Sequence, residues 1–244
     1  MLPAALLQRR AELMESIVLA GGFGTRLASR LQGVPKPMAP VAGRPFLEIL
    51  LTQLRRAGCS RVLLSVGHLH QVIQDRFGTS FLGMRVDYVV ESVPLGTGGA
   101  TRLALAQARE DSVLVLNGDT FLDADYAEML RFHTAEKAEV TLAVVHQPNV
   151  ARYGGVVIEA KRIVGFEEKG RTGAGFISAG TYVLNRNLAW PPTLAERFSI
   201  ESDVFVPEIA RLRPAAFKVA GYFLDIGIPE DYDRAQTELA EFTR

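Results

Sequence analysis

The sequence predicts an α/β fold in which helices cover a mixed, mainly parallel sheet. Short apolar runs rich in β-branched residues alternate with amphipathic stretches along the first half of the chain. One run, VLVL at 113–116, is continuously apolar, as expected of a central strand that is buried on both faces. The 244 residues are 48% hydrophobic and 22% charged, which is an ordinary balance for a globular protein with a large core.

The first half contains the clearest alternation of elements. Strands are expected at 16–20, 61–66, 86–90 and 112–116, and helices at 46–57, 71–77 and 100–108. Ligands of open α/β sheets bind beyond the carboxyl ends of the strands. Three of these strands are followed directly by AGGFGTR, ESVPLGTGG and NGDT, so a site is expected where these segments meet.

The pattern changes after residue 138. Closely spaced strands at 140–146, 156–158, 163–167 and 176–184 predict an antiparallel extension of the sheet. A helix-like stretch at 202–211, a strand near 217–220 and a final helix at 229–242 complete the prediction. We expect residues 1–14 to form an N-terminal extension and residues 15–244 to form a single domain.

Charge and cysteine content restrict the partners and the compartment. The 27 basic residues equal the 27 acidic ones, so neither nucleic acid nor a membrane surface is an expected partner. The single cysteine, Cys59, excludes an internal disulfide and is expected to be a small packed residue, which suits a reducing cytoplasm. No segment has the length of a signal peptide's apolar core or a membrane span.

The glycine-rich loop after the first strand is a candidate phosphate site. Three glycines in four residues allow close approach of a ligand to inward-pointing N–H groups, although an ordinary strand-to-helix turn would use the same glycines. A dinucleotide fingerprint would need glycine or alanine where Leu27 stands, and the Gly-Lys-Ser/Thr ending of a P-loop is absent. Arg26 and Lys36 add positive charge, and the prolines around Lys36 should hold it on an extended loop rather than a helix.

LAGGFGTRL at 19–27, followed by PKPM at 35–38, resembles the signature of the sugar-1-phosphate nucleotidyltransferases, and the resemblance extends from Ser16 to about Tyr232. It implies a Rossmann-like, glycosyltransferase-A-type three-layer fold. It also implies that a nucleoside triphosphate and a sugar 1-phosphate are converted to a nucleotide sugar and pyrophosphate. The loop would wrap the triphosphate and Arg26 and Lys36 would be catalytic cations. The nucleotide-binding residues of this region would be Leu19, Ala20, Gly21, Gly22, Gly24, Thr25, Arg26 and Lys36.

The segment ESVPLGTGGA at 91–100 resembles the nucleobase loop of the same family. The resemblance implies that the backbone around Gly96 and Thr97 reads the edge of the base. Ionised Glu91 is an acceptor only, so it could receive the N1 and N2 protons of guanine, which uracil and thymine cannot present in that arrangement. The alternative is that Glu91 is a solvated loop carboxylate.

Two aspartates are candidate magnesium ligands. Asp119 ends the most apolar strand, where a carboxylate is costly to bury without a cation, and Asp225 follows a second apolar run in YFLDIGIPEDY at 222–232. Mg²⁺ typically takes one or two protein carboxylates and completes its shell with phosphate and water. Both motifs resemble the family's metal-ligand motifs, although Ile228 stands where many relatives have threonine. Asn117, beside Asp119, would bind the nucleotide.

The segment FEEK at 166–169 resembles the family's sugar-phosphate segment. There Glu168 would accept protons from sugar hydroxyls and Lys169 would bind the sugar phosphate. Outside this context, FEEK would be a surface strand end with an exposed Glu–Lys pair. By the same resemblance, Tyr153, Gly154 and Gly180 would line the sugar pocket.

The order and spacing of these motifs most resemble the D-glycero-α-D-manno-heptose-1-phosphate guanylyltransferases within the family, which implies GTP as the triphosphate. Alternatives are mannose-1-phosphate guanylyltransferase and MurNAc/GlcNAc-1-phosphate uridylyltransferase. A non-catalytic sugar-nucleotide-binding regulatory protein would be expected to lose Arg26, Lys36, Asp119 or Asp225, and all four are present. The oligomeric state stays open, and a homo-oligomer is compatible with the sequence.

Overall fold

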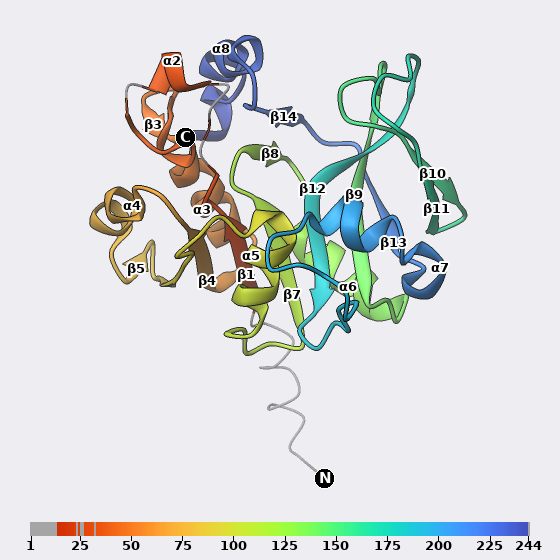
Figure 1. The fold of residues 1–244 in the computed structure, drawn as a ribbon. Coiled ribbons are helices and arrows are strands. Elements are labelled where there is room, and N and C mark those ends of the chain that lie inside the picture. The colour runs from red at the N-terminus through yellow and green to blue at the C-terminus, as the bar shows by residue number, and fades with distance from the viewer. Residues whose placement is uncertain (1–13, 23, 25–26, 32, 244) are drawn as a thin grey trace.

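A computed structural model describes residues 14–22, 24, 27–31 and 33–243 of the chain. In this part of the chain a ten-stranded mixed sheet forms the centre of the molecule (Figure 1). Its strand order is β10-β11-β13-β9-β12-β7-β1-β4-β6-β5. The predicted extension at 1–14 lies, except for Met14, outside the described residues.

One half of the sheet is the predicted parallel one. Its strands β1 (Met14–Leu19), β4 (Cys59–Val66), β6 (Met84–Val90) and β7 (Ser112–Asn117) pair in parallel. Helices α3 (Phe46–Arg56), α4 (His70–Phe77) and α5 (Gly96–Leu105) connect them. The existence and type of these seven elements confirm the prediction. The carboxyl ends of β1, β6 and β7 consequently reach one edge of the sheet together.

The other half is less parallel than predicted. Its strands are β9 (Val140–Gln147), β10 (Val156–Glu159), β11 (Arg162–Phe166), β12 (Gly175–Asn185) and β13 (Ala215–Val219). β12 is antiparallel to both β7 and β9, and only β13 pairs with β9 in parallel. The expected antiparallel extension is therefore confirmed, but the sheet is not mainly parallel over its full width. Parallel pairing follows from which strands become neighbours, and local sequence patterns do not carry that information.

Two predicted helices near the C-terminus have different bounds. The helix expected at 202–211 is divided into a π-helical turn, η3 (Glu201–Phe205), and a short helix, α7 (Ile209–Leu212). Pro207 lies between them, and its ring and missing N–H interrupt a continuous helix. The final helix α8 (Pro229–Glu238) ends earlier than predicted and is followed by the 3₁₀ turn η4 (Ala240–Thr243).

Several elements were not predicted. The longest is helix α6 (Tyr126–Ala135), whose N-cap residue Asp125 accepts a hydrogen bond from the Glu128 backbone N–H. An aspartate followed three residues later by glutamate is a helix-start signal that could have revealed it. The others are short. They are α2 (Ala28–Leu31), η2 (Lys36–Met38), β2 (Pro40–Val41), β3 (Arg44–Pro45), β5 (Ser80–Phe81), β8 (Thr120–Leu122) and β14 (Phe223–Asp225).

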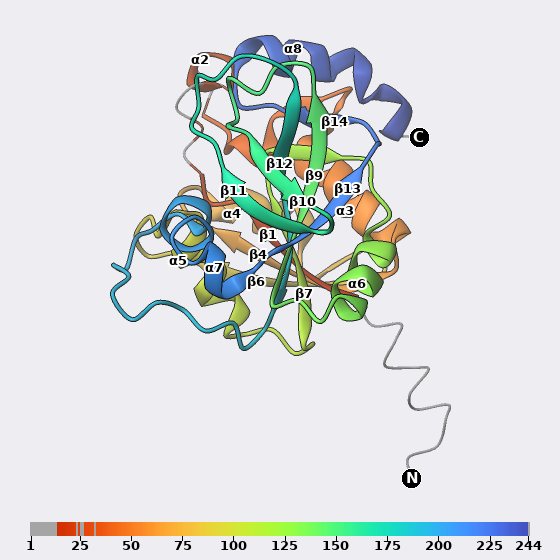
Figure 2. The same ribbon diagram turned by 90° about the vertical axis from the view of Figure 1, so that its right-hand side faces the viewer.

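Alternation along the strands builds two cores and hence three layers. Val18 and Leu64 belong to one core with residues of α3, α4 and α6, whereas Ile17 and Leu63 belong to the other with residues of α5, η3 and α7. Successive strand side chains point to opposite faces, so a continuously apolar strand supplies both cores. Figure 2 shows α3 and α6 on one side of the sheet and α5 and α7 on the other. Among the described residues, no helix has the length and apolar character needed to cross a bilayer.

Candidate active site

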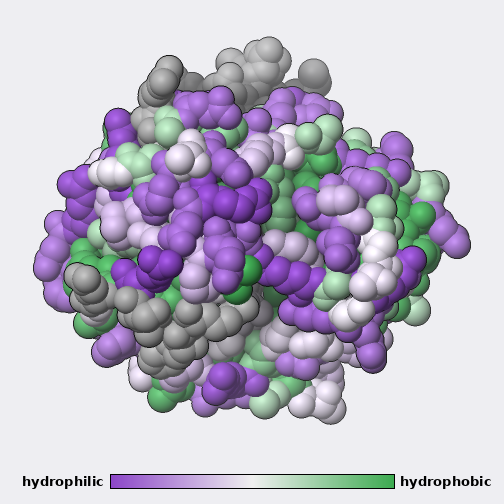
Figure 3. All heavy atoms as spheres, turned by 90° about the horizontal axis from the view of Figure 1, so that it is seen from above, coloured by the Kyte–Doolittle hydropathy of each residue, from purple (hydrophilic) through white to green (hydrophobic). Residues whose placement is uncertain are grey.

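A cavity of about 280 Å³ opens where β1, β6 and β7 end. It is lined by Leu19, Gly21, Gly22, Lys36, Pro37, Glu91, Pro94, Gly96, Thr97, Ala100, Asn117, Gly118, Asp119 and Arg197. Figure 3 looks down on this end of the molecule, where hydrophilic side chains dominate the surface and hydrophobic ones show in between. The three segments that follow strands in the sequence thus meet around one cavity.

Most of the predicted nucleotide-binding residues line this cavity, but two described ones do not. Ala20 is buried and its N–H donates to the Ser65 carbonyl oxygen at 2.7 Å. Gly24 adjoins the stem of Lys36, and a Cβ at position 24 would lie 2.8 Å from the Lys36 Cβ. The predicted residues Thr25 and Arg26 lie outside the described residues.

Gly21 and Glu91 are in close contact across the cavity wall. A Cβ at position 21 would lie 2.5 Å from Oε1 of Glu91 and would displace that carboxylate. Glu91 Oε1 accepts a hydrogen bond from Ser65 Oγ, and its Oε2 accepts one from the Leu95 N–H, each at 3.1 Å. Glu91 is therefore not the solvated loop carboxylate considered as an alternative. A carboxylate has about four acceptor positions, so capacity remains for a ligand.

Lys36 is placed differently from the prediction. Pro35 is extended as expected, but Lys36 begins the 3₁₀ turn η2 instead of lying on an extended loop. The fixed φ of Pro37 is compatible with the first turn of a helix, which explains the difference. The Lys36 side chain is buried, and its Nζ donates to Asp119 Oδ2 at 2.5 Å. A buried ammonium group consequently lies at the end of β7.

The two predicted metal ligands lie close together. Strands β8 and β14 pair so that Asp225 lies opposite Thr120, and the Ile226 N–H donates to the Asp119 carbonyl oxygen at 3.0 Å. Burial raises the pKa of Asp225, and the negative charge of Asp119 raises it further. The charges of Lys36 and Arg152 act in the opposite direction. The pair thus brings two carboxylates together, and Asp119 of the two lines the cavity.

This arrangement fits magnesium better than a structural zinc. Mg²⁺ accepts one or two carboxylates together with phosphate oxygens and water, whereas structural zinc requires four protein ligands. Among the residues the structure describes, no three or more His, Cys, Asp or Glu side chains are grouped as a metal site. Two adjacent carboxylates, one of which lines the cavity, are therefore compatible with a magnesium ion that shares its shell with substrate.

The predicted sugar-side residues lie outside the cavity lining. Tyr153 packs edge-to-face on Phe223, two positions before Asp225, with ring centroids 5.5 Å apart. Gly154 is buried against the Lys169 stem, while the side chains of Glu168 and Lys169 are exposed. Of these residues, Tyr153 is in contact with strand β14, which ends at Asp225.

Gly180 lies on β12, the strand beside β7. A Cβ at this position would lie 2.4 Å from Asn117 Nδ2. Asn117 Oδ1 is buried and has no hydrogen-bond partner among the described residues. Gly180 therefore does not line the cavity itself, but it contacts Asn117, which does.

Two arginines of the site were missed by sequence reasoning. Arg152 donates to Asp225 Oδ2 at 3.2 Å and also to Asp231 Oδ2. It directly precedes Tyr153, so its position beside a motif was the available signal. Arg197 also lines the cavity. It lies in a connection that has no glycine-rich motif and does not directly follow the end of a strand, so no signal in the sequence pointed to it. Hydrogen bonds that the sequence pattern does not reveal bring that connection to the base loop, among them one from Phe198 N–H to the Leu95 carbonyl oxygen at 3.0 Å.

Comparisons with known proteins agree with this geometry. Residues 15–241 match the model of the family described as nucleotidyl transferase. The chain is 39% identical to a D-glycero-alpha-D-manno-heptose 1-phosphate guanylyltransferase of Aneurinibacillus thermoaerophilus, with 94% of this chain and 100% of the relative covered. It is 37% identical to a mannose-1-phosphate guanylyltransferase of Mycobacterium tuberculosis, with 93% of this chain and 64% of that protein covered.

A solved structure is also similar over its full length. The crystal structure of HddC from Yersinia pseudotuberculosis complexed with GMP-PN superimposes with a TM-score of 0.81 at 35% sequence identity. The alignment covers 93% of this chain and 100% of that one.

Proposed function

This chain belongs to the nucleotidyl transferase family, and from that membership we propose that it transfers GMP from GTP to D-glycero-α-D-manno-heptose 1-phosphate and releases pyrophosphate. The observation that carries this proposal is the 39% identity to a heptose 1-phosphate guanylyltransferase over that relative's whole length. The cavity residues supply what the reaction needs. We also infer that the three layers are of the glycosyltransferase-A type.

The reaction is an in-line attack by an oxygen of the sugar phosphate on the α-phosphorus of GTP. That oxygen is already ionised near neutral pH, so no general base is required and catalysis consists of positioning and charge stabilisation. Lys36 and Arg197 place two cations on the cavity wall, where they would stabilise the departing pyrophosphate. Arg26 is proposed for the same task.

The base and the sugar are assigned to opposite sides of the aspartate pair. Glu91, held in place by Ser65 and Leu95, would receive the N1 and N2 protons of guanine beside the backbone of Gly96 and Thr97. On the other side, Lys169 would bind the sugar phosphate and Glu168 the sugar hydroxyls, next to Tyr153, Gly154 and Gly180. Asn117, the last residue of β7, lines the cavity and contacts Gly180, and it would bind the nucleotide.

We propose that Asp119 and Asp225 hold Mg²⁺. Bound there, the ion would supply a Lewis acid that offsets phosphate charge. Lys36 already contacts Asp119 and Arg152 contacts Asp225, so each carboxylate has a cationic partner that keeps it oriented.

The test is a panel of four nucleoside triphosphates against heptose, mannose and hexosamine 1-phosphates, with magnesium and with pyrophosphate release as the readout. We expect GTP with D-glycero-α-D-manno-heptose 1-phosphate to give the highest kcat/KM. A preference for mannose 1-phosphate, or for UTP with a hexosamine 1-phosphate, would replace the proposed substrate pair. Lack of turnover with every pair would overturn the enzyme assignment and favour a sugar-nucleotide-binding regulator.

A further inference from the structure

Residues 197–200, in the connection between β12 and η3, and Glu201, the first residue of η3, join the two sides of the site. Arg197 lines the cavity, and the next residue, Phe198, exchanges backbone hydrogen bonds with the base loop. Its N–H donates to the Leu95 carbonyl oxygen at 3.0 Å, and its carbonyl oxygen accepts from the Gly98 N–H at 2.9 Å. The Ile200 N–H donates to Thr97 Oγ1 at 3.1 Å. This connection is therefore fixed to the start of α5.

Glu201, the next residue along the chain, binds two residues of β12, the strand that we assign to the sugar side of the site. Its Oε1 accepts hydrogen bonds from Ser178 Oγ at 2.6 Å and from Tyr182 Oη at 2.8 Å, both of β12. Burial raises the pKa of Tyr182 well above its ordinary value, with the Glu201 charge adding to the effect, so the phenol keeps its proton and donates. Glu201 also begins the π-helical turn η3, a distortion that is frequent at functional sites.

The two residues that Glu201 binds flank an irregularity in β12. Ser178 pairs with Val144 and Tyr182 with Leu142, so the residues between them bulge out of the β9 ladder. Within the bulge, Gly180 has φ +64° and lies against the Asn117 amide, with no room for a Cβ. Bulges beside active sites re-aim residues, and a segment that has lost its pairing with β9 needs other contacts on that side to hold it. Glu201 supplies such contacts at both ends.

We propose that Glu201 is a positioning residue for the sugar 1-phosphate. By holding Ser178 and Tyr182, it fixes the β12 bulge at a set distance from the base loop, to which residues 198–200 are tied. It also takes the single hydroxyl proton of Ser178. The half-buried Ser178 oxygen accepts from the Gly180 N–H at 3.5 Å and keeps one further acceptor position for a sugar hydroxyl. The inference rests on the proposed function, because it assigns the β12 side to the sugar.

The test compares Glu201→Ala with Glu201→Gln and with Asp203→Asn. The last is a matched control because Asp203 is an exposed acid of the same turn, whose side chain accepts a local hydrogen bond from the Ser199 N–H at 2.7 Å. We expect Glu201→Ala to raise KM for the sugar 1-phosphate about tenfold, the effect of losing roughly 1.4 kcal/mol, while KM for GTP changes less than about twofold. Glu201→Gln keeps an acceptor oxygen and should restore most of the loss. Asp203→Asn should behave as wild type.

The outcomes separate this inference from the proposed function. If the wild type turns over no sugar 1-phosphate, the proposed function fails first. If the wild type is active and Glu201→Ala changes both KM values equally, changes neither, or only lowers the thermal unfolding temperature, the positioning role is wrong. If Glu201→Ala does not fold, the double variant Ser178→Ala/Tyr182→Phe removes the same two bonds from the other side. This double variant should show the same selective rise in KM for the sugar 1-phosphate. If KM for the sugar 1-phosphate does not rise selectively, the proposal is also overturned.

Discussion

The negative charge of Asp225 destabilises the folded state. Its pKa is raised by burial and by the Asp119 charge, so the folded chain holds a proton there more tightly than the unfolded chain does. The stabilisation from that tighter binding is full below the ordinary aspartate pKa and is lost as the pH rises through the raised value. At neutral pH the two carboxylates are kept together against repulsion, as expected of groups retained for a cation.

Replacing either carboxylate should therefore separate activity from stability. We expect Asp225→Asn and Asp119→Asn each to reduce kcat by about a hundredfold or more, since metal-ion stabilisation contributes several kcal/mol to such reactions. The unfolding temperature of metal-free Asp225→Asn at pH 7 should equal or exceed that of wild type. Steady-state kinetics and calorimetry check the two parts. Near-normal turnover would remove the residue from the metal site.

Glu91 is a second residue with a separable role. Glu91→Gln retains an oxygen for Ser65 or Leu95 but turns an amide N–H₂ toward a guanine edge that is itself a donor. We expect the preference for GTP over UTP in kcat/KM to narrow about tenfold, because a hydrogen bond to a charged group contributes about 1.5–3 kcal/mol. Ser65→Ala, which removes only the supporting bond, serves as the control and should leave the ratio within about threefold. An unchanged ratio in Glu91→Gln would make Glu91 a structural carboxylate.

At the scale of elements, helix α6 is fixed to the sheet through a buried histidine. His133 is bonded through Nδ1 to Thr141 Oγ1 at 2.8 Å and through Nε2 to Asn185 Oδ1 at 3.0 Å. Burial lowers its pKa below 6.5, although the Asn185 bond acts in the opposite direction. The stability from keeping His133 neutral is therefore fully present above pH 6.5 and is lost as the pH falls toward the lowered value.

The free energy of unfolding should accordingly decrease between pH 6.5 and 5.5, with a contribution from His133 of at most about 1.4 kcal/mol per pH unit. Urea unfolding of wild type and of His133→Gln at pH 7.5, 6.5 and 5.5 measures this contribution. The free energy of unfolding should change less with pH in His133→Gln, because glutamine takes up no proton in this range. This variant should also be less stable than wild type at pH 7.5. His146→Gln, at an exposed histidine, should retain the wild-type slope. Equal slopes in all three proteins would contradict the assignment.

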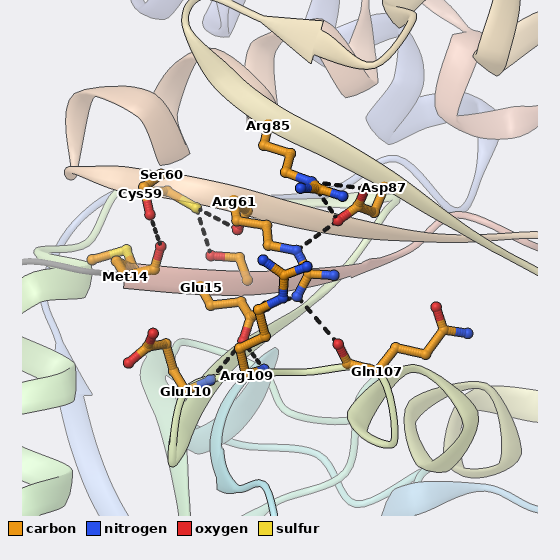
Figure 4. Close-up of polar contacts among 11 residues, drawn as sticks. Met14, Glu15, Cys59, Ser60, Arg61, Arg85, Asp87, Gln107, Arg109 and Glu110 are labelled. Atoms are coloured by element: carbon orange, nitrogen blue, oxygen red, sulfur yellow. Dashed lines mark hydrogen bonds and ion pairs between the residues drawn. The ribbon is translucent and has the colours of Figure 1, made fainter.

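At the scale of the whole molecule, stability and chemistry lie at opposite ends of the sheet. At the amino end, the buried carboxylate of Glu15 accepts from Arg61 and from the backbone N–H groups of Arg109 and Glu110, at 2.7 and 2.9 Å for the last two (Figure 4). Arg61 also donates to Asp87 at 2.6 Å. Burial alone would raise the pKa of Asp87, but its hydrogen bonds from Arg61 and Arg85 lower it.

Glu15→Gln should lower the free energy of unfolding by about 3 kcal/mol, since removing one partner of a buried ion pair leaves the other charge uncompensated. KM values well below the unfolding temperature should not change, because Glu15 is roughly 13 Å along β1 from the cavity residue Leu19. Arg85→Gln, at the exposed end of the same network, should cost no more than about 1 kcal/mol. A loss of catalysis at full folding in Glu15→Gln would show that the two ends are coupled.

The elements of the parallel half, and the position of three motifs directly after their strands, could be predicted from the sequence. Those features depend on local periodicity and on glycine and proline, which act over a few residues. The tertiary structure alone decided the antiparallel insertion of β12, the pairing of β8 with β14 that joins Asp119 to Asp225, and the positions of Arg152, Arg197 and Glu201. These contacts join distant segments, and a lone arginine or glutamate has no periodic pattern that would predict its partner. Local pattern therefore gave the parts of the site, and strand pairing gave their arrangement.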